Sequence, residues 1–236
     1  MRVYFFPKWL IQGLLLVLCG LLAAGVVWSF LGDEDASVMA EPIYQGTNTE
    51  QKVALAINVD WGEDVLPEML DVLEQENVKA TFFVTGRFAE KFPELVQQIA
   101  AAGHEIGNHG YKHPHPDQLS VAQNQKDITQ SEAVLEKLTG TKPALYAPPY
   151  GEHGETCLQA AEQCGYTTIL WTADTVDWEE PAPSHDTLVQ RVTGDKLTSG
   201  AILLMHPKAH TAEALPDIIH TIAVKGYQCV KVSEVL

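Results

Sequence analysis

Short apolar strands alternate with amphipathic helices from residue 53 to residue 236, at the end of this 236-residue chain. Strands are expected at 53–57, 80–85, 104–107, near Leu145, and at 167–172, 201–205 and 229–232. Helices are expected at 65–76, 93–102, 120–138, 155–164, 185–193 and 212–224. Such alternation implies parallel strands joined by helical crossovers. About seven strand–helix units of this size predict an α/β fold, a distorted and incomplete (β/α) barrel rather than an eight-fold one.

Residues 9–32 form an apolar run without a charge, preceded by Arg2 and Lys8. About 20 apolar residues span a bilayer, and positively charged flanks stay in the cytoplasm. We therefore expect a single-pass transmembrane helix that anchors the protein in the cell membrane, with residues 1–8 cytoplasmic and the C-terminal domain extracellular. The alternative is a signal peptide cleaved near Ala40, although the apolar core of such peptides usually has only about 7–15 residues.

The rest of the chain divides into a linker and one domain. Residues 33–52 are polar and lack apolar periodicity, so a tether is expected there. Residues 53–236 suffice for one domain with a sizeable core. The net charge is −16, and every acidic residue follows the apolar run. This charge argues against a nucleic acid or an anionic membrane surface as partner of the domain, and a neutral or amino-bearing polymer is easier to bind.

His109 and His113 are four residues apart and follow the expected strand 104–107. Two imidazoles at this spacing on one helical turn point the same way and bind one divalent metal. The spacing alone is weak evidence, because it also fits two ordinary surface histidines. The position strengthens the prediction, since chemistry in parallel α/β folds gathers at the carboxyl ends of the strands.

Polar and aromatic side chains follow four further strands. They lie in Asn58-Val59-Asp60-Trp61-Gly62, Ala147-Pro148-Pro149-Tyr150-Gly151, Asp174-Thr175-Val176-Asp177-Trp178 and His206-Pro207. Each group has an ordinary interpretation as a turn cap, a rigid turn, a helix cap or a buried core histidine. Five such groups at one edge of a parallel sheet nevertheless predict a functional site.

Together these motifs resemble the polysaccharide deacetylase family with a NodB-type domain, carbohydrate esterase family 4. The resemblance covers about residues 52–236. It is carried by Thr81-Phe-Phe-Val-Thr-Gly86, Gly103-His-Glu-Ile-Gly-Asn-His109, His109-Gly-Tyr-Lys-His113, Ala147-Pro-Pro-Tyr-Gly151, Asp174-x-x-Asp177-Trp178 and Ile202-x-Leu204-x-His206. The order and spacing of the motifs make the resemblance specific.

The resemblance implies removal of N-acetyl groups from amino sugars of peptidoglycan or of a chitin-like glycan. A divalent metal, zinc most often, with cobalt or manganese as alternatives, would be held by two histidines and one Asp, and would activate a water molecule. His206 would act as general acid. The backbone N–H of Tyr150, next to Pro149, would stabilise the oxyanion. Leu204 and Trp178 would line the pocket for the acetyl methyl group and the sugar ring.

Two positions depart from the family. Its first motif usually reads Thr-Phe-Asp-Asp-Gly, with a base followed by a metal ligand, so an alignment without gaps leaves Asp60 as base and Trp61 in place of the ligand. An indole has only an N–H donor and cannot bind a metal. Ala147 replaces an Arg that pairs with the base. A first motif of the form Asn-Val-x-Trp-Gly resembles a subgroup from spore-forming Gram-positive bacteria.

Three outcomes follow for the chemistry. The metal rests on the two histidines with Asp60 as base, or Asp60 becomes a ligand and Glu63, Asp64 or Asp174 takes the proton. In the third outcome hydrolysis is lost, and the domain is a glycan-binding pseudoenzyme. Because catalytic zinc sites normally have three protein ligands, we expect a metal-dependent deacetylase of reduced activity, with the pseudoenzyme as the alternative.

Overall fold

The structure is a computed structural model that describes residues 41–47 and 49–236. The predicted transmembrane helix at 9–32 and the alternative cleavage near Ala40 lie outside the described residues. Within the described part of the chain, none of the helices combines the length and the apolar character needed to cross a bilayer.

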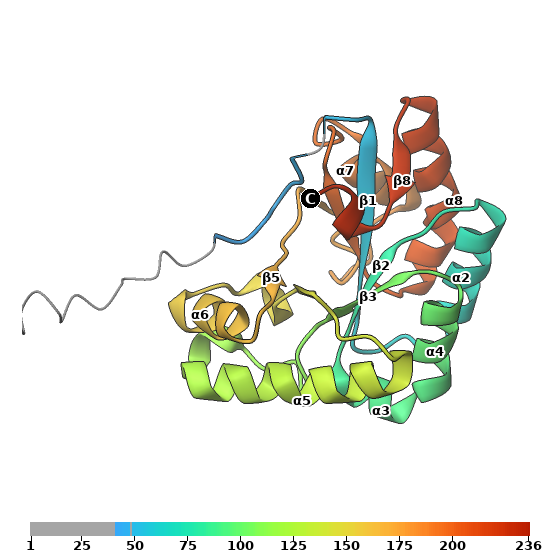
Figure 1. Ribbon diagram of the computed structural model, residues 1–236. Helices are drawn as coiled ribbons and strands as arrows, with labels where there is room; N and C mark the ends of the chain where they lie inside the picture. Colours follow the sequence, from blue (N-terminus) through green and yellow to red (C-terminus); the bar gives the residue numbers. More distant parts are fainter. Residues whose placement is uncertain (1–40, 48) are drawn as a thin grey trace, which may run out of the picture. The chain divides into compact units, whose positions relative to one another are not determined.

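Eight short strands form one sheet in the centre of the domain (Figure 1). They are β1 (Lys52–Val59), β2 (Thr81–Val84), β3 (Glu105–Asn108), β4 (Leu145–Tyr146), β5 (Thr167–Thr168), β6 (Ala173–Asp174), β7 (Ile202–Met205) and β8 (Gln228–Val230). Seven of them follow the order β5-β4-β3-β2-β1-β7-β6, and β8 pairs with β1 off this path. All pairings between these strands are parallel. The predicted α/β class and the incomplete barrel of about seven parallel strands are confirmed.

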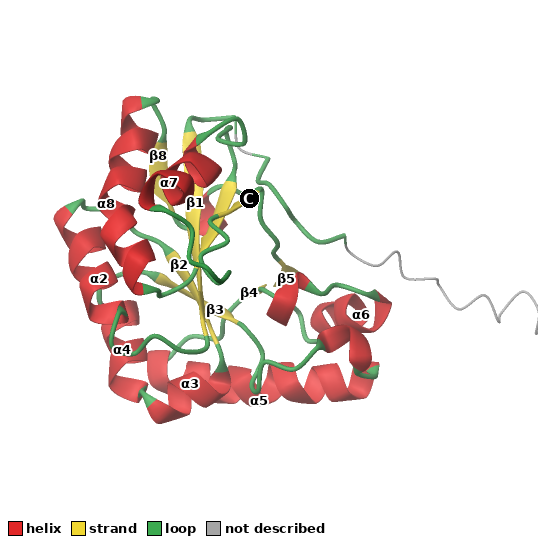
Figure 2. Cartoon of the chain, turned by 180° about the vertical axis from the view of Figure 1, so that it is seen from behind, coloured by secondary structure: helices red, strands yellow, loops and turns green. Residues whose placement is uncertain are grey.

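The helices form an outer layer around the strands, as Figure 2 shows. They are α2 (Leu66–Gln75), α3 (Gly86–Lys91), α4 (Pro93–Ala101), α5 (Val121–Thr139), α6 (Glu155–Gln163), α7 (His185–Thr193) and α8 (Ala209–Val224). Short 3₁₀ turns lie at Pro116–Gln118, Pro149–Gly151 and Val232–Glu234. The long helix α5 begins after the capping residue Ser120 and ends at Gly140 in the left-handed region, as its sequence predicts.

Two expectations about local structure were wrong. The helix α3 was not expected, because its six residues are too few to show an apolar period. The strand expected at 167–172 pairs only at β5, with one further bridge at Ile169, and a separate strand β6 follows. Such short strands depend on neighbours that are distant in the sequence, so local patterns do not define their ends.

Strand β1 connects the two sides of the core. Its side chains alternate in direction, as in any strand. Leu55 and Ile57 pack in the large apolar cluster together with residues of helices α2 and α8. Ala54 and Ala56 belong instead to a second cluster, with Phe83. Burial on both faces explains why the strand is continuously apolar rather than alternating.

Part of the segment expected as a tether packs on the domain. Ile43 forms a parallel bridge with Ile169, and Gln45 forms an antiparallel bridge with Ala201. The backbone N–H of Gly46 donates to Gly200 O at 2.8 Å. Residues 43–46, upstream of β1, therefore pack against the segment that follows β5 and the segment that precedes β7.

Candidate active site

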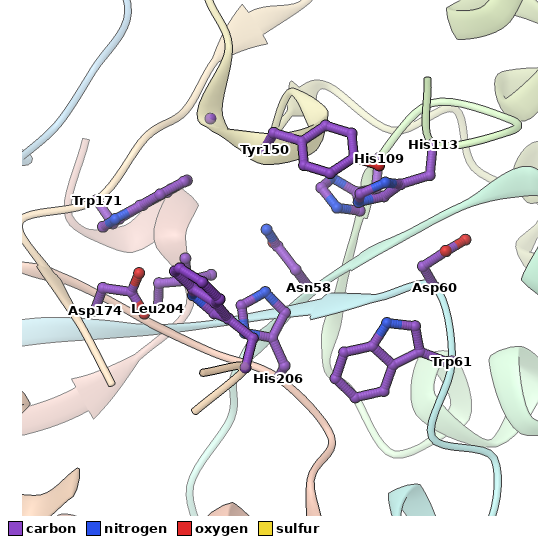
Figure 3. Close-up of a pocket in the computed structure, with 12 residues that line it drawn as sticks. Asn58, Asp60, Trp61, His109, His113, Tyr150, Trp171, Asp174, Leu204 and His206 are labelled. Atoms are coloured by element: carbon purple, nitrogen blue, oxygen red, sulfur yellow. The ribbon is translucent and has the colours of Figure 1, made fainter. Parts of the chain in front are cut away.

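A pocket lies at the carboxyl edge of the sheet, where the loops after β1, β3, β4, β6 and β7 meet (Figure 3). Its lining consists of Asn58, Asp60, Trp61, His109, His113, Tyr150, Gly151, Trp171, Asp174, Trp178, Leu204 and His206. Of the nine site residues that the sequence predicts, only Pro149 is absent from this lining. The structure thus brings the predicted residues together, and their roles in catalysis stay predictions.

His109 is a neutral imidazole with one nitrogen available. Its Nδ1 lies 2.7 Å from the carbonyl oxygen of Ala147, and a carbonyl only accepts, so Nδ1 carries the proton. Nε2 therefore keeps a lone pair. Burial, and after it the nearby His113, lower the pKa of His109 to about 3. Burial also lowers the pKa of His113. Neutral imidazoles are the form that binds metals.

The two histidines meet through a loop and not through a helical turn, so that part of the sequence interpretation was wrong. Their ring centroids are 4.9 Å apart. The chain between them turns through positive φ angles of 74° at Gly110 and 55° at His113. Asp127 of α5 holds the loop, because its carboxylate accepts from the backbone N–H groups of Tyr111 at 2.8 Å and of the next residue at 3.1 Å.

The carboxylate of Asp60 is occupied by Arg87, the second residue of α3. Nε of Arg87 donates to Oδ1 of Asp60 at 2.6 Å, and Nη2 donates to Oδ2. The hydroxyl of Thr85 also donates to Oδ1, at 2.8 Å. The hydrogen bond to Asp60 raises the pKa of the Arg87 guanidinium. Arg87 thus provides from another element the partner that Ala147 cannot provide.

The residues of the pocket only partly fit the metal that the family resemblance implies. The two imidazoles are suitable ligands, but Trp61 stands where a third ligand is needed, and the Asp60 carboxylate is bound to Arg87 and Thr85. Among the described residues, no three His, Cys, Asp or Glu side chains are grouped so that they could hold a metal ion. The predicted set of His109, His113 and Asp60 is therefore not assembled as a three-ligand site.

His206 is held by Asp177, whose role the sequence interpretation missed. His206 Nδ1 lies 2.8 Å from Oδ1 of Asp177, and the backbone N–H of His206 donates to Oδ2 at 2.7 Å. Thr211 Oγ1 donates to the same Oδ2. Burial raises the pKa of Asp177, but the hydrogen bonds and charge of His206 outweigh burial, so the net pKa is lowered. An ionised Asp177 fixes the imidazole with Nε2 available to a ligand.

Asp174, which the sequence predicts as a catalytic residue, lies in the pocket, but the carboxylate hydrogen-bonded to His206 is that of Asp177. Its Oδ1 accepts from the backbone N–H of Val176 at 2.7 Å. Burial raises the pKa of Asp174. The motif Asp174-x-x-Asp177 contains both carboxylates, and the sequence offered no signal for which one the histidine would meet.

Backbone strain gathers in the loops around the pocket. Four non-glycine residues of the described chain have positive φ, and three of them are His113, Tyr150 and Val176. For the β-branched Val176, a φ of 56° is a true outlier. Such strain persists where the surrounding structure enforces it, which is common at functional sites.

Aromatic rings form the open walls of the pocket. Trp61, Tyr150 and Trp178 are 37%, 57% and 53% exposed, although large apolar side chains are usually covered. Trp61 stacks on His206 with ring centroids 5.9 Å apart, and Lys208 Nζ lies 4.6 Å from the Trp61 ring centroid. Tyr150 stacks on His115 at 3.9 Å. Exposed aromatic faces beside polar groups suit a ligand with apolar and polar sides.

The family model and a named relative of this chain both point to deacetylases of polysaccharides. The family model described as polysaccharide deacetylase matches residues 45–169. The uncharacterized protein YlxY of Bacillus subtilis is 38% identical over 200 residues, which cover 85% of this chain and 62% of YlxY, so the chain spans less than two thirds of that relative. A peptidoglycan-N-acetylglucosamine deacetylase of Bacillus cereus is 38% identical over 190 residues, 78% of this chain and 68% of the relative.

Two solved structures of one protein are also similar to this chain. BA3943 of Bacillus anthracis, described as a CE4 family pseudoenzyme, superposes with a TM-score of 0.78 at 37% identity, covering 83% of this chain and 68% of BA3943. A BA3943 mutant described as having restored enzymatic activity superposes with the same TM-score at 35% identity, covering 83% and 71%.

Because His104 and His109 are buried, we expect acid to lower the free energy of unfolding of the metal-free protein. Burial lowers the pKa of His104 to about 4 and that of His109 to about 3. Below pH ~6.5 the unfolded chain therefore takes up protons that the folded chain does not, and stability falls as pH falls, by up to about 1.4 kcal/mol per pH unit for each histidine.

Urea unfolding with a chelator at pH 7, 6 and 5 measures this slope. His109→Gln should reduce the slope, whereas the matched change at the exposed His220 should not. Equal slopes in both variants would contradict the assignment of His109 as a neutral buried histidine.

Proposed function

The chain belongs to the polysaccharide deacetylase family, carbohydrate esterase family 4, and on that premise we propose that its pocket binds N-acetylated amino sugars of peptidoglycan and hydrolyses their acetamido groups slowly. The observation that carries the proposal is the meeting of two neutral imidazoles with the His206–Asp177 pair at one edge of the sheet. The relatives named peptidoglycan deacetylases support peptidoglycan over a chitin-like glycan.

In this proposal each part of the pocket lining contacts a different part of the substrate. The sugar ring packs on the exposed aromatic faces of Trp178 and Tyr150, and the acetyl methyl group lies against Leu204. The backbone N–H of Tyr150 donates to the oxygen that becomes negative as the acetamide carbonyl is attacked. His206, fixed through Nδ1 by Asp177, gives a proton from Nε2 to the leaving amine.

The slow rate follows from the incomplete metal site. Zinc, or cobalt or manganese in its place, would polarise the acetamide carbonyl and activate water when held by His109 and His113. Two protein ligands hold a metal less firmly than the usual three. The Asp60 carboxylate must also leave or share its contacts with Arg87 to accept a proton.

A second candidate is a glycan-binding pseudoenzyme. Trp61 at the ligand position, Ala147 at the Arg position and the ion pair of Asp60 with Arg87 all favour it. The similarity to BA3943 adds weight, because that protein is described as a pseudoenzyme. Both candidates share the ligand, and they differ only in whether acetate is released.

Acetate release separates the two candidates. The full chain is incubated with zinc and with either peptidoglycan or N-acetylglucosamine oligomers, beside the double variant Trp61→Asp with Ala147→Arg. The variant regains a third ligand and the Arg, so we expect it to release acetate at least about 10-fold faster than the natural chain, the lower end of what residues that support a metal site contribute. Adding His206→Ala to the variant should return it to the natural rate.

The outcomes are distinct. Zero release by the natural chain with a gain in the variant favours the pseudoenzyme. Equal rates in the two proteins would contradict the incomplete site as the cause of slow turnover. No release by either protein would remove hydrolysis from the proposal.

Metal affinity tests the same site without catalysis. We expect the natural chain to bind zinc weakly through its two imidazoles and Trp61→Asp to bind at least about 10-fold more tightly, because it restores a third ligand. Calorimetric titration measures both constants. Trp178→Asp is the matched control, since it places a carboxylate elsewhere on the pocket wall; an equal gain in that variant would refute the assignment of position 61.

We also propose that residues 9–32 anchor the domain on the outer face of the cell membrane, where peptidoglycan lies. The apolar run with its basic flank supports this placement. The protein should remain in the membrane fraction after alkaline extraction, and external protease should digest its domain in protoplasts. Recovery of soluble protein with a new N-terminus near Ala40 would favour the signal peptide instead.

A further inference from the structure

Asn58 is a buried polar residue of the pocket whose side chain has no partner in the described protein. It is 5% exposed and lines the pocket. Its Oδ1 is buried without a hydrogen-bond donor among the described residues, and its Nδ2 is the end that points into the pocket in Figure 3. By contrast, Asp60, His109 and His206 each have a protein partner. The carboxamide of Asn58 therefore differs from its polar neighbours.

The direction of β1 explains how the side chain reaches the pocket. Ala54 and Ala56 face the second core cluster, on the side opposite Leu55 and Ile57. Asn58 is two residues further along and shares their face. Since β1 ends at the next residue, that face opens there into the pocket. Figure 3 shows the nitrogen end of Asn58 pointing into the space between His206 and Tyr150.

A comparison with Asn108, at the end of β3, indicates that the Asn58 side chain does not stabilise the fold. The Asn108 carboxamide is bonded at both ends: Nδ2 donates to Ile128 O at 3.0 Å and to the Tyr166 hydroxyl, and Oδ1 accepts from Gly110 N. An unpaired buried amide lowers the stability of the folded state, whereas an apolar side chain of similar size does not. Because the Nδ2 end of the Asn58 amide reaches the pocket, a ligand bound there is a partner that it can meet.

We propose that Asn58 recognises the acetamido group of the bound sugar, with Nδ2 donating to its carbonyl oxygen. This rests on the proposed binding of amino sugars but does not require hydrolysis. Apolar surface from Leu204 and Trp171 also lines the pocket. An acetamido group offers both a carbonyl acceptor for the amide and a methyl group for the apolar wall. A sugar hydroxyl would leave the apolar wall without a contact.

Binding of matched oligomers tests the proposal. The ligands are the tetramer of N-acetylglucosamine and its fully deacetylated counterpart, titrated calorimetrically into the full chain with a chelator present. We expect the natural protein to prefer the acetylated tetramer. Asn58→Leu should weaken binding of the acetylated tetramer by about 3- to 10-fold, the net contribution of one hydrogen bond, and should leave the deacetylated tetramer unchanged.

Two further measurements exclude a merely structural effect. The Tm of Asn58→Leu should equal or exceed that of the natural protein, because an unpaired amide is removed. Asn58→Asp loses the donor and gains a negative charge, so it should shift the preference toward the deacetylated, cationic tetramer. A Tm lowered by several degrees in Asn58→Leu would show that the side chain supports the fold, and the proposal would fall.

The failures of the two proposals are distinguishable. If the natural protein binds neither tetramer, the proposed function fails, and the role of Asn58 fails with it. If the natural protein prefers the acetylated tetramer and Asn58→Leu keeps the same preference, the proposed function stands and the inference about Asn58 is overturned.

Discussion

Parallel pairing of β1 with β2 on one side and with β7 on the other is the constraint on which the pocket depends. Val59 is in register with Val84, and Val84 with Asn108, so the residues that follow these strands emerge side by side. Ile57 is in register with Met205, which brings the loop with His206 to the same edge. Residues from distant parts of the sequence therefore meet at one edge of the sheet.

Two buried carboxylates divide the pocket into halves with different chemistry. Asp177 is bound to His206 and fixes the orientation of its imidazole, so the half that would serve the leaving amine in the proposed reaction is complete. Asp60 is bound to Arg87, and the indole of Trp61 offers no ligand atom, so the half that would hold a metal in the proposed reaction is incomplete. Under the proposed function, this division favours recognition of an N-acetylated sugar over rapid hydrolysis.

The sequence predicted the alternating fold and most of the pocket, because residues directly after apolar strands are placed by strand order alone. It did not predict Arg87 as the partner of Asp60, since that ion pair joins the end of β1 to a six-residue helix without an apolar period. It assigned the two histidines to a helical turn, whereas the left-handed residues Gly110 and His113 form a loop. The choice of Asp177 over Asp174 depends on packing against α8, through Thr211, which is distant in the sequence.

The most direct test of this account is a crystal structure of the natural chain with an N-acetylglucosamine oligomer at saturating concentration. The account predicts a sugar on the aromatic walls, with its acetamido carbonyl oxygen within hydrogen-bond distance of Asn58 Nδ2 and Asp60 still bound to Arg87. An oligomer bound elsewhere on the domain, or a pocket that stays free of sugar at that concentration, would contradict it.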